Sequence, residues 1–285
     1  MINGLAQTTI AGVGVVGAWG KAPAFPRAEK THAGGPRSQA FSLKKTSTSK
    51  LLEALPEDEL DRLRRYLEPV SLKQHQTLYD IGDRLRFVYF PGDCVASRLA
   101  VGADGSTVEV GLIGNEGLIG LAACLGARAA HHRTVVEIAG YAARIDVGAL
   151  RERLCHSLVL RRLITNYGRY FMTQVAQRSV CHRRHTVIQQ LCSWLLMVHE
   201  RAGSKHLSFT QDVIAQRLGA RRAGISVAAN RLQADGMIFY RRGRITILDK
   251  ESLEAAACEC YSILKTDPGA GLGSGNAAPV LQASA

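Results

Sequence analysis

The spacing of the apolar residues changes along the chain, and each spacing predicts a different kind of element. From 51 to 67 leucines recur at helical intervals, and Pro56 suits the first turn of a helix. From 72 to 146 the apolar runs are short and are separated by turn sequences. From 147 onward helical spacing returns. The pattern predicts a β-rich domain followed by a mainly helical half.

Short apolar runs at intervals of roughly 8–12 residues are typical of a sandwich, roll or barrel. The dipeptide Asp104-Gly105 suits a hairpin turn, because glycine tolerates a positive φ angle. We assign residues 49–146 to this domain. We expect the preceding extension, residues 1–48, to be disordered because it is rich in small residues, proline and lysine. The expected strands are Phe87–Phe90, Val95–Val101, Thr107–Ile113, Val135–Ile138 and Tyr141–Ile145.

The helical pattern from 147 to 178 contains apolar residues at alternating spacings of four and three. Such a heptad seam pairs helices. We therefore assign 147–180 to one long dimerisation helix, whose seam contacts a second copy of the chain. The alternative is an amphipathic helix that packs on its own domain. The residues expected at the dimer interface are Leu160, Ile164, Tyr167 and Phe171.

The segment 181–250 contains two short helices joined by a turn with a glycine. Thr210 suits the N-cap of the first helix, and Gly219 suits its end. The second helix is expected from Arg222 to Ala234. This order is the helix-turn-helix pattern. The buried stripe of the second helix is predicted to be Ile225, Ala228, Ala229 and Leu232.

Two further strands, Met237–Tyr240 and Ile245–Leu248, flank a basic turn. A helix pair followed by such a hairpin predicts a winged helix, whose recognition helix enters the major groove of DNA. Arginines at the wing tip suit contacts with phosphates. The predicted DNA-binding residues are Thr210, Arg221, Arg222, Ala223, Ser226, Val227, Asn230, Arg241, Arg242 and Arg244.

Charge supports this assignment. The chain has a formal net charge of +12. Residues 181–250 contain 12 Lys and Arg against 4 Asp and Glu, a net charge of +8, whereas residues 51–180 contain 16 against 15. A compact basic segment beside a neutral domain favours an anionic partner such as double-stranded DNA. The remainder, 251–285, is expected to be a terminal helix and a disordered tail.

The seven cysteines are an odd number without metal-finger spacing, which is typical of a reduced, cytoplasmic protein. We expect no metal site. A redox-active pair is one interpretation of Cys258 and Cys260, but we favour unremarkable residues of a terminal helix. No apolar run reaches the ~18 residues that a membrane span needs. We therefore expect no membrane association.

The order of β-roll, long helix and winged helix over residues 49–249 resembles the Crp/Fnr family of bacterial transcription regulators. The resemblance implies an α+β fold with a cyclic-nucleotide-binding-like β-roll, a homodimer, promoter DNA and RNA polymerase as partners, and no enzymatic activity. The family's recognition-helix core, Ser-Arg-Glu-Thr-Val-x-Arg, is matched here only by Arg222 and the apolar Ile225. Ala223 and Val227 replace its Glu and second Arg, so the family's common operator is not implied.

Cyclic-nucleotide-binding members of that family hold the ribose and phosphate with a Gly-Glu-Leu turn and a later Arg-Ser/Thr pair. The matching effector residues here would be Gly120, Arg133 and Thr134. Leu121 replaces the ribose-binding Glu and cannot accept a hydrogen bond from a hydroxyl. We therefore expect no cofactor and an unknown effector, with a cyclic-nucleotide-responsive regulator as the alternative. His131 and His132 are of a type that could hold a metal or haem, but we interpret them as a solvated loop pair.

Two other classes are disfavoured. An enzyme would have to use the neighbouring Cys155 and His156 or the glycine-rich loop 114–120. An adjacent Cys and His lack an orienting third group, and the loop lacks the Lys-Ser/Thr of a phosphate-binding loop. A cyclic-nucleotide-gated adaptor without DNA contact would not need the basic wing.

Overall fold

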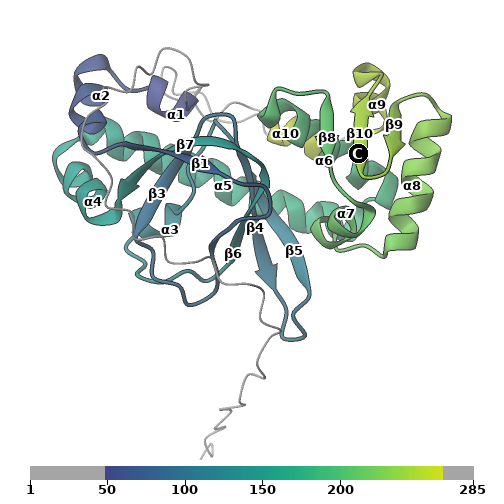
Figure 1. The fold of residues 1–285 in the computed structure, drawn as a ribbon, viewed down its shortest axis with the longest axis horizontal. Coiled ribbons are helices and arrows are strands. Elements are labelled where there is room, and N and C mark those ends of the chain that lie inside the picture. Colours follow the sequence, from purple (N-terminus) through teal and green to yellow (C-terminus); the bar gives the residue numbers. More distant parts are fainter. Residues whose placement is uncertain (1–48, 266–285) are drawn as a thin grey trace, which may run out of the picture.

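The computed structural model describes residues 49–265, which form a β-roll, a long helix and a second, mainly helical body (Figure 1). Two short helices, α1 (Lys50–Glu53) and α2 (Glu57–Arg64), precede the roll. The roll consists of two antiparallel sheets with the strand orders β1-β7-β3 and β2-β6-β4-β5. The predicted extension 1–48 and the tail after 265 lie outside the described residues.

The five expected strands of the roll are all present. They are β3 (Phe87–Pro91), β4 (Val95–Val101), β5 (Thr107–Ile113), β6 (Arg133–Ile138) and β7 (Gly140–Asp146). Three elements were not predicted, because they are short or largely exposed at the edge of a sheet and so lack a clear apolar period. They are β1 (Glu68–Leu72), β2 (Thr77–Tyr79) and the one-turn helix α3 (Leu121–Cys124).

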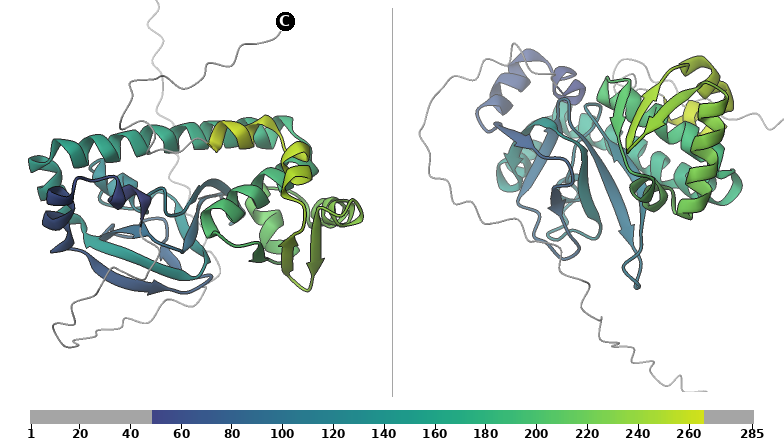
Figure 2. Two further views of the ribbon diagram at one scale, coloured as in Figure 1. Left: turned by 90° about the horizontal axis from the view of Figure 1, so that it is seen from above. Right: turned by 45° about the vertical axis from the view of Figure 1, so that its right-hand side comes forward.

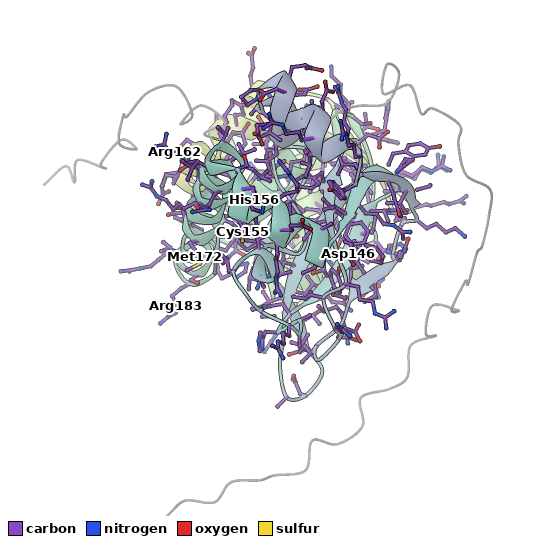
Figure 3. The ribbon with its side chains drawn as sticks, turned by 90° about the vertical axis from the view of Figure 1, so that its left-hand side faces the viewer. Asp146, Cys155, His156, Arg162, Met172 and Arg183 are labelled. Carbon is purple, nitrogen blue, oxygen red and sulfur yellow. The ribbon has the colours of Figure 1, made fainter. Side chains whose placement is uncertain are left out.

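The predicted single helix from 147 is two helices, α4 (Val147–His156) and α5 (Leu158–Arg184). Ser157 separates them with an extended backbone, at φ −120° and ψ 109°, and its hydroxyl accepts a hydrogen bond from the Leu160 amide at 3.2 Å. Asp146 lies at the start of α4, and Cys155 and His156 lie at its end (Figure 3). The apolar period continues across the break, which is why the sequence pattern did not reveal it.

The assignment of the α5 seam to a dimer interface is wrong. Leu160, Ile164, Tyr167 and Phe171 are all at most 3% exposed within a single chain and belong to the core of the β-roll. Glycines in the roll allow this approach: a Cβ atom on Gly111 would lie 2.6 Å from the Phe171 ring. The alternative, an amphipathic helix that packs on its own domain, is therefore correct for this face.

The second body begins with α6 (Val187–Ala202) and is built around a core that includes Trp194, whose ring meets that of Phe209 edge-on at 4.9 Å between centroids. Figure 2 shows α5 running along the β-roll toward this body, with α10 beside it. The remaining elements are β8 (His206–Ser208), α7 (Gln211–Leu218), α8 (Arg222–Ala234), β9 (Ile238–Arg241), β10 (Arg244–Ile247), α9 (Lys250–Ala256) and α10 (Glu259–Leu264).

Three carboxylates of the β-roll are paired with arginines outside it, and all six side chains are at most 10% exposed. Glu109 on β5 accepts from Arg178 of α5 and from the Trp194 indole of α6. The other two pairs are Glu116 with Arg201 of α6 at 2.8 Å and Glu137 with Arg217 of α7 at 2.6 Å. Because charges buried this deeply are costly to separate, the pairs of Arg201 and Arg217 fix the second body against the roll, and the pair of Arg178 fixes α5 there.

Candidate nucleic-acid interface

The first helix of the helix-turn-helix is bounded by the two residues that the sequence indicates. The Thr210 hydroxyl accepts a hydrogen bond from the Val213 amide at 3.3 Å and so caps α7. Gly219 ends α7 in the left-handed region, at φ 60°. Thr210 is exposed, so its role as a helix cap is compatible with its predicted contact with DNA.

The recognition helix α8 has the orientation that its periodicity predicts. Its stripe of Ile225, Ala228, Ala229 and Leu232 is buried in the core of the second body. Ala223, Val227 and Asn230 are exposed on the other side, and Val227 is 71% exposed. Because Val227 is so exposed, its apolar side chain contributes little to packing within the described part of the chain.

Ser226 occupies an intermediate position between the two helices. It is half-buried, and its hydroxyl donates a hydrogen bond of 2.5 Å to Oε1 of Gln211 on α7. The contact holds α8 against α7. Any DNA contact by this hydroxyl would use its remaining acceptor capacity.

Arg221 and Arg222 begin the recognition helix. The Arg222 guanidinium lies 3.4 Å from Asp212, and the two side chains are 67% and 60% exposed. An ion pair that is so exposed contributes at most about 1 kcal/mol to stability. The pairing therefore leaves Arg222 free to exchange Asp212 for a group on DNA.

The wing is a tight hairpin between β9 and β10. Arg242 and Gly243 both have positive φ angles, 50° and 76°, as a two-residue type I′ turn requires. Arg241, Arg242 and Arg244 are exposed. Across residues 49–265, no carboxylate lies within ion-pair distance of these three arginines.

Hydrogen bonds tie the wing to the start of α7. The Phe209 amide donates to the Gly243 carbonyl at 2.8 Å, and the Tyr240 hydroxyl donates to the Phe209 carbonyl at 3.1 Å. The wing arginines, the N-cap of α7 and the leading end of α8 therefore lie on one connected scaffold. Sequence reasoning missed these contacts, because they join residues more than 30 positions apart.

Only two of the three predicted effector residues line a common cavity. Gly120 and Thr134 line a small cavity in the roll, but Arg133 does not. Arg133 points away from the cavity and pairs with both carboxylate oxygens of Asp80, at 3.0 and 2.9 Å. In this structure Arg133 therefore has Asp80 as its partner and does not line the cavity.

The cation that does line this cavity is Arg98 of β4, which lies over the Phe171 ring at 5.3 Å and within 2.9 Å of Nδ1 of His132. Burial, together with the charge of Arg98, lowers the pKa of His132. Burial also lowers the pKa of Arg98. His131 and His132 both line the cavity, His132 as a half-buried residue and His131 as an exposed one. The cavity measures about 30 Å³, room for one or two water molecules.

A helix-turn-helix followed by a basic two-stranded wing defines a winged-helix DNA-binding domain. Residues 189–256 match the Crp-like helix-turn-helix domain family. A comparison with curated proteins gave no match. Within residues 49–265, no helix is both long and apolar enough to cross a membrane.

Solved structures share the arrangement of most of the described chain. FixK2 from Bradyrhizobium japonicum matches with a TM-score of 0.59 at 14% identity, over 67% of this chain and 98% of that chain. The c-di-GMP-responsive regulator CLP from Xanthomonas campestris matches with a TM-score of 0.57 at 14% identity, over 67% and 99%. A putative crp/fnr-family regulator from Eubacterium rectale matches with a TM-score of 0.55 at 17% identity, over 73% and 97%.

This chain therefore has the fold of a Crp/Fnr-type transcription regulator, with a helix-turn-helix DNA-binding domain after its β-roll. The resemblance and the α+β fold class predicted from the sequence are confirmed.

Proposed function

We propose that the protein is a homodimeric, sequence-specific regulator that reads promoter DNA with α8 and grips the backbone with its wing. The observation that carries the proposal is that the leading end of α8, the three wing arginines and the N-cap of α7 are all exposed and belong to elements linked by direct contacts. Cations without carboxylate partners at the wing suit phosphates, and a helix with an exposed outer face suits the major groove.

The roles of the individual residues follow from their side chains. Arg222 is suited to donate two hydrogen bonds to a guanine, and Asn230, further along α8, suits an adenine or a phosphate. Ala223 and Val227 cannot form side-chain hydrogen bonds, so their contacts would be with thymine methyl groups. Arg241, Arg242 and Arg244 would hold phosphates and add affinity without choosing the sequence.

The outer face of α5 is the surface we propose for the dimer, in place of the buried seam. Four of the eleven large hydrophobic side chains that are exposed in the described chain lie on this helix: Leu158, Val159, Met172 and Val180. Leu158 and Met172 are 67% and 68% exposed and are separated by two heptads. Met172 lies on the outer side of α5 together with Arg162 and Arg183 (Figure 3). Pairing this face with its copy would cover apolar surface that the single chain leaves in water.

Selection of binding sites from random DNA tests the proposal. A two-fold symmetric dimer should select a palindrome whose half-sites lie about one helical turn, or 10–10.5 base pairs, apart. The control is the same chain with Arg222, Arg241, Arg242 and Arg244 changed to alanine. Recovery of no motif by the unmodified protein, or of one without two-fold symmetry, would refute the dimeric reader.

The effector of the β-roll is proposed not to be a cyclic nucleotide. Leu121 is buried and lies 3.9 Å from the position of a Cβ atom on Gly168, so it contributes packing rather than a hydrogen bond. The cavity is far smaller than the roughly 300 Å³ of a typical small ligand site. Calorimetry with cyclic AMP and cyclic GMP should show no binding tighter than about 100 μM. Low-micromolar binding that Arg98→Ala abolishes would overturn this prediction.

By the same family resemblance, we propose a cytoplasmic location, RNA polymerase as the partner at the promoter, and no catalytic activity. The neighbouring Cys155 and His156, the strongest enzyme candidates in the sequence, are both exposed at the end of α4 (Figure 3).

A further inference from the structure

Four potential metal ligands meet at the junction between α5 and the second body. Cys181 lies in the last turn of α5, and His185 follows four residues later. Cys258 and Cys260 lie where α9 gives way to α10. The ligand atoms of all four side chains lie within 4.8 Å of one another. The fold thus brings Cys258 and Cys260 to Cys181 and His185, a proximity that their spacing in the sequence does not indicate.

Two of the distances between these atoms match the edges of a tetrahedron with one ion at its centre. With Zn–S bonds of about 2.3 Å and Zn–N bonds of about 2.0–2.1 Å, tetrahedral geometry requires S···S edges of ~3.8 Å and N···S edges of ~3.5 Å. The Cys181 and Cys258 sulfurs are 3.7 Å apart, and His185 Nδ1 lies 3.5 Å from the Cys260 sulfur. We propose that Cys181, His185, Cys258 and Cys260 form a structural Zn²⁺ site.

The surroundings supply the outer partners that such a site needs. His185 directs Nδ1 toward the sulfurs, while its Nε2 lies 3.1 Å from Oε1 of Glu259. A ligand histidine that gives its other ring N–H to a carboxylate is oriented for metal binding. Gln177 Nε2 donates to the Cys260 sulfur at 3.1 Å, and the Ser193 hydroxyl lies 3.1 Å from the Cys258 sulfur. Both contacts suit sulfurs that carry negative charge.

The chemistry of the four ligand atoms indicates which ion the site would bind. Three thiolates and an imidazole are soft and borderline ligands of the kind that zinc takes in closed structural sites. The three thiols release their protons to solvent, and the neutral imidazole binds through its lone pair, so the site carries a net charge of −1. A disulfide requires about 2.05 Å between sulfurs, and an iron–sulfur cluster places several metal atoms between its ligands. Neither geometry suits four ligand atoms that meet around a single centre.

The position of the site gives it a structural consequence. Cys181 and His185 flank the point where α5 ends, and α10 lies along α5 (Figure 2). The three sulfur ligands are each at most 5% exposed. A bound ion would join the end of α5 to the connection between α9 and α10. It would thereby fix the junction through which the β-roll is linked to the DNA-binding domain.

The full-length protein, purified under reducing conditions, should contain one zinc per chain by elemental analysis. After removal of the metal with a chelator, titration with Co²⁺ should give the visible absorption and the thiolate charge-transfer bands of a tetrahedral cobalt–thiolate centre. Added Zn²⁺ should then displace the cobalt and protect the cluster cysteines from alkylation. Absence of stoichiometric Zn²⁺ and Co²⁺ binding would overturn the proposal, as would iron with acid-labile sulfide or a disulfide within the cluster.

The effect of single substitutions on Zn²⁺ binding tests which residues form the site. Cys181→Ala and Cys258→Ala should each weaken Zn²⁺ binding by more than the ~10–100-fold that is typical of losing an outer partner, and Glu259→Gln should fall within that range. The matched control is Cys94→Ala, because Cys94 is also buried but lies in the β-roll. Equal loss of zinc in the control would refute the assignment. If the cluster variants fail to fold, the cobalt spectrum of the unmodified chain decides the question.

Discussion

At the scale of single residues, the arginines of the DNA-binding domain divide by what surrounds them. Arg222 leads the recognition helix beside Asp212, and Arg242 is at the tip of the wing without a carboxylate within ion-pair distance in residues 49–265. We expect Arg222→Ala to cost roughly 1–3 kcal/mol of specific binding and to relax the preference at one base position per half-site. We expect Arg242→Ala to weaken all sequences equally and to lower the salt slope by about one unit per half-site.

Site selection and binding isotherms at several salt concentrations, applied to both variants, measure these effects. The control is Arg231→Ala, because Arg231 is also an exposed arginine of α8 but is paired with Asp235 at 2.8 Å. An unchanged motif in Arg222→Ala would show that the proposed orientation of α8 on DNA is wrong.

At the scale of elements, α5 has two faces with different partners. Its seam is buried in the β-roll, and its outer face carries Leu158 and Met172 in water. Met172→Glu should place two like charges in the proposed dimer interface. It should raise the dimer dissociation constant by about 100-fold or more, which corresponds to roughly 2.7 kcal/mol. Sedimentation equilibrium measures this constant.

The matched control for Met172→Glu is Leu125→Glu, because Leu125 is 71% exposed in the roll and far along the chain from α5. It should leave the dimer unchanged. A monomeric unmodified protein at micromolar concentration, or equal dissociation in both variants, would contradict the proposed interface.

At the scale of the whole molecule, buried ion pairs hold the two bodies together. Glu137 is fully buried, and burial raises its pKa even beside Arg217. Arg217→Ala would leave this carboxylate without its partner, and we expect a loss of about 3–5 kcal/mol in the free energy of unfolding. Denaturant unfolding provides the measurement. Arg62→Ala, which removes an exposed arginine paired with Glu59 at 2.8 Å, should cost less than about 1 kcal/mol.

The double variant Arg217→Met with Glu137→Gln tests the reason for that loss. It removes both charges, so it should recover much of the stability that Arg217→Ala loses. If Arg217→Ala is as stable as the unmodified protein, the Glu137–Arg217 pair does not hold α7 on the roll.

The sequence by itself determined the elements whose signals are local. The helix-turn-helix was predictable from a cap at Thr210, a left-handed end at Gly219 and a 3.6-residue period in α8. The five main strands of the roll were predictable from apolar runs between turns. These signals depend on interactions among residues within a few positions of one another, so they can be read without knowing the fold.

Only the tertiary structure decided which partners those elements meet. The period of α5 identified a buried face correctly, but period alone cannot tell whether the roll or a second copy buries it. Arg133 pairs with Asp80, which lies 53 positions away, while Thr134 and Arg98 from two different strands line the cavity. Cys181 and Cys258 are 77 positions apart, and their sulfurs meet only because α10 folds back beside α5. Contacts between distant segments depend on how whole elements pack, and no local pattern in the chain records that packing.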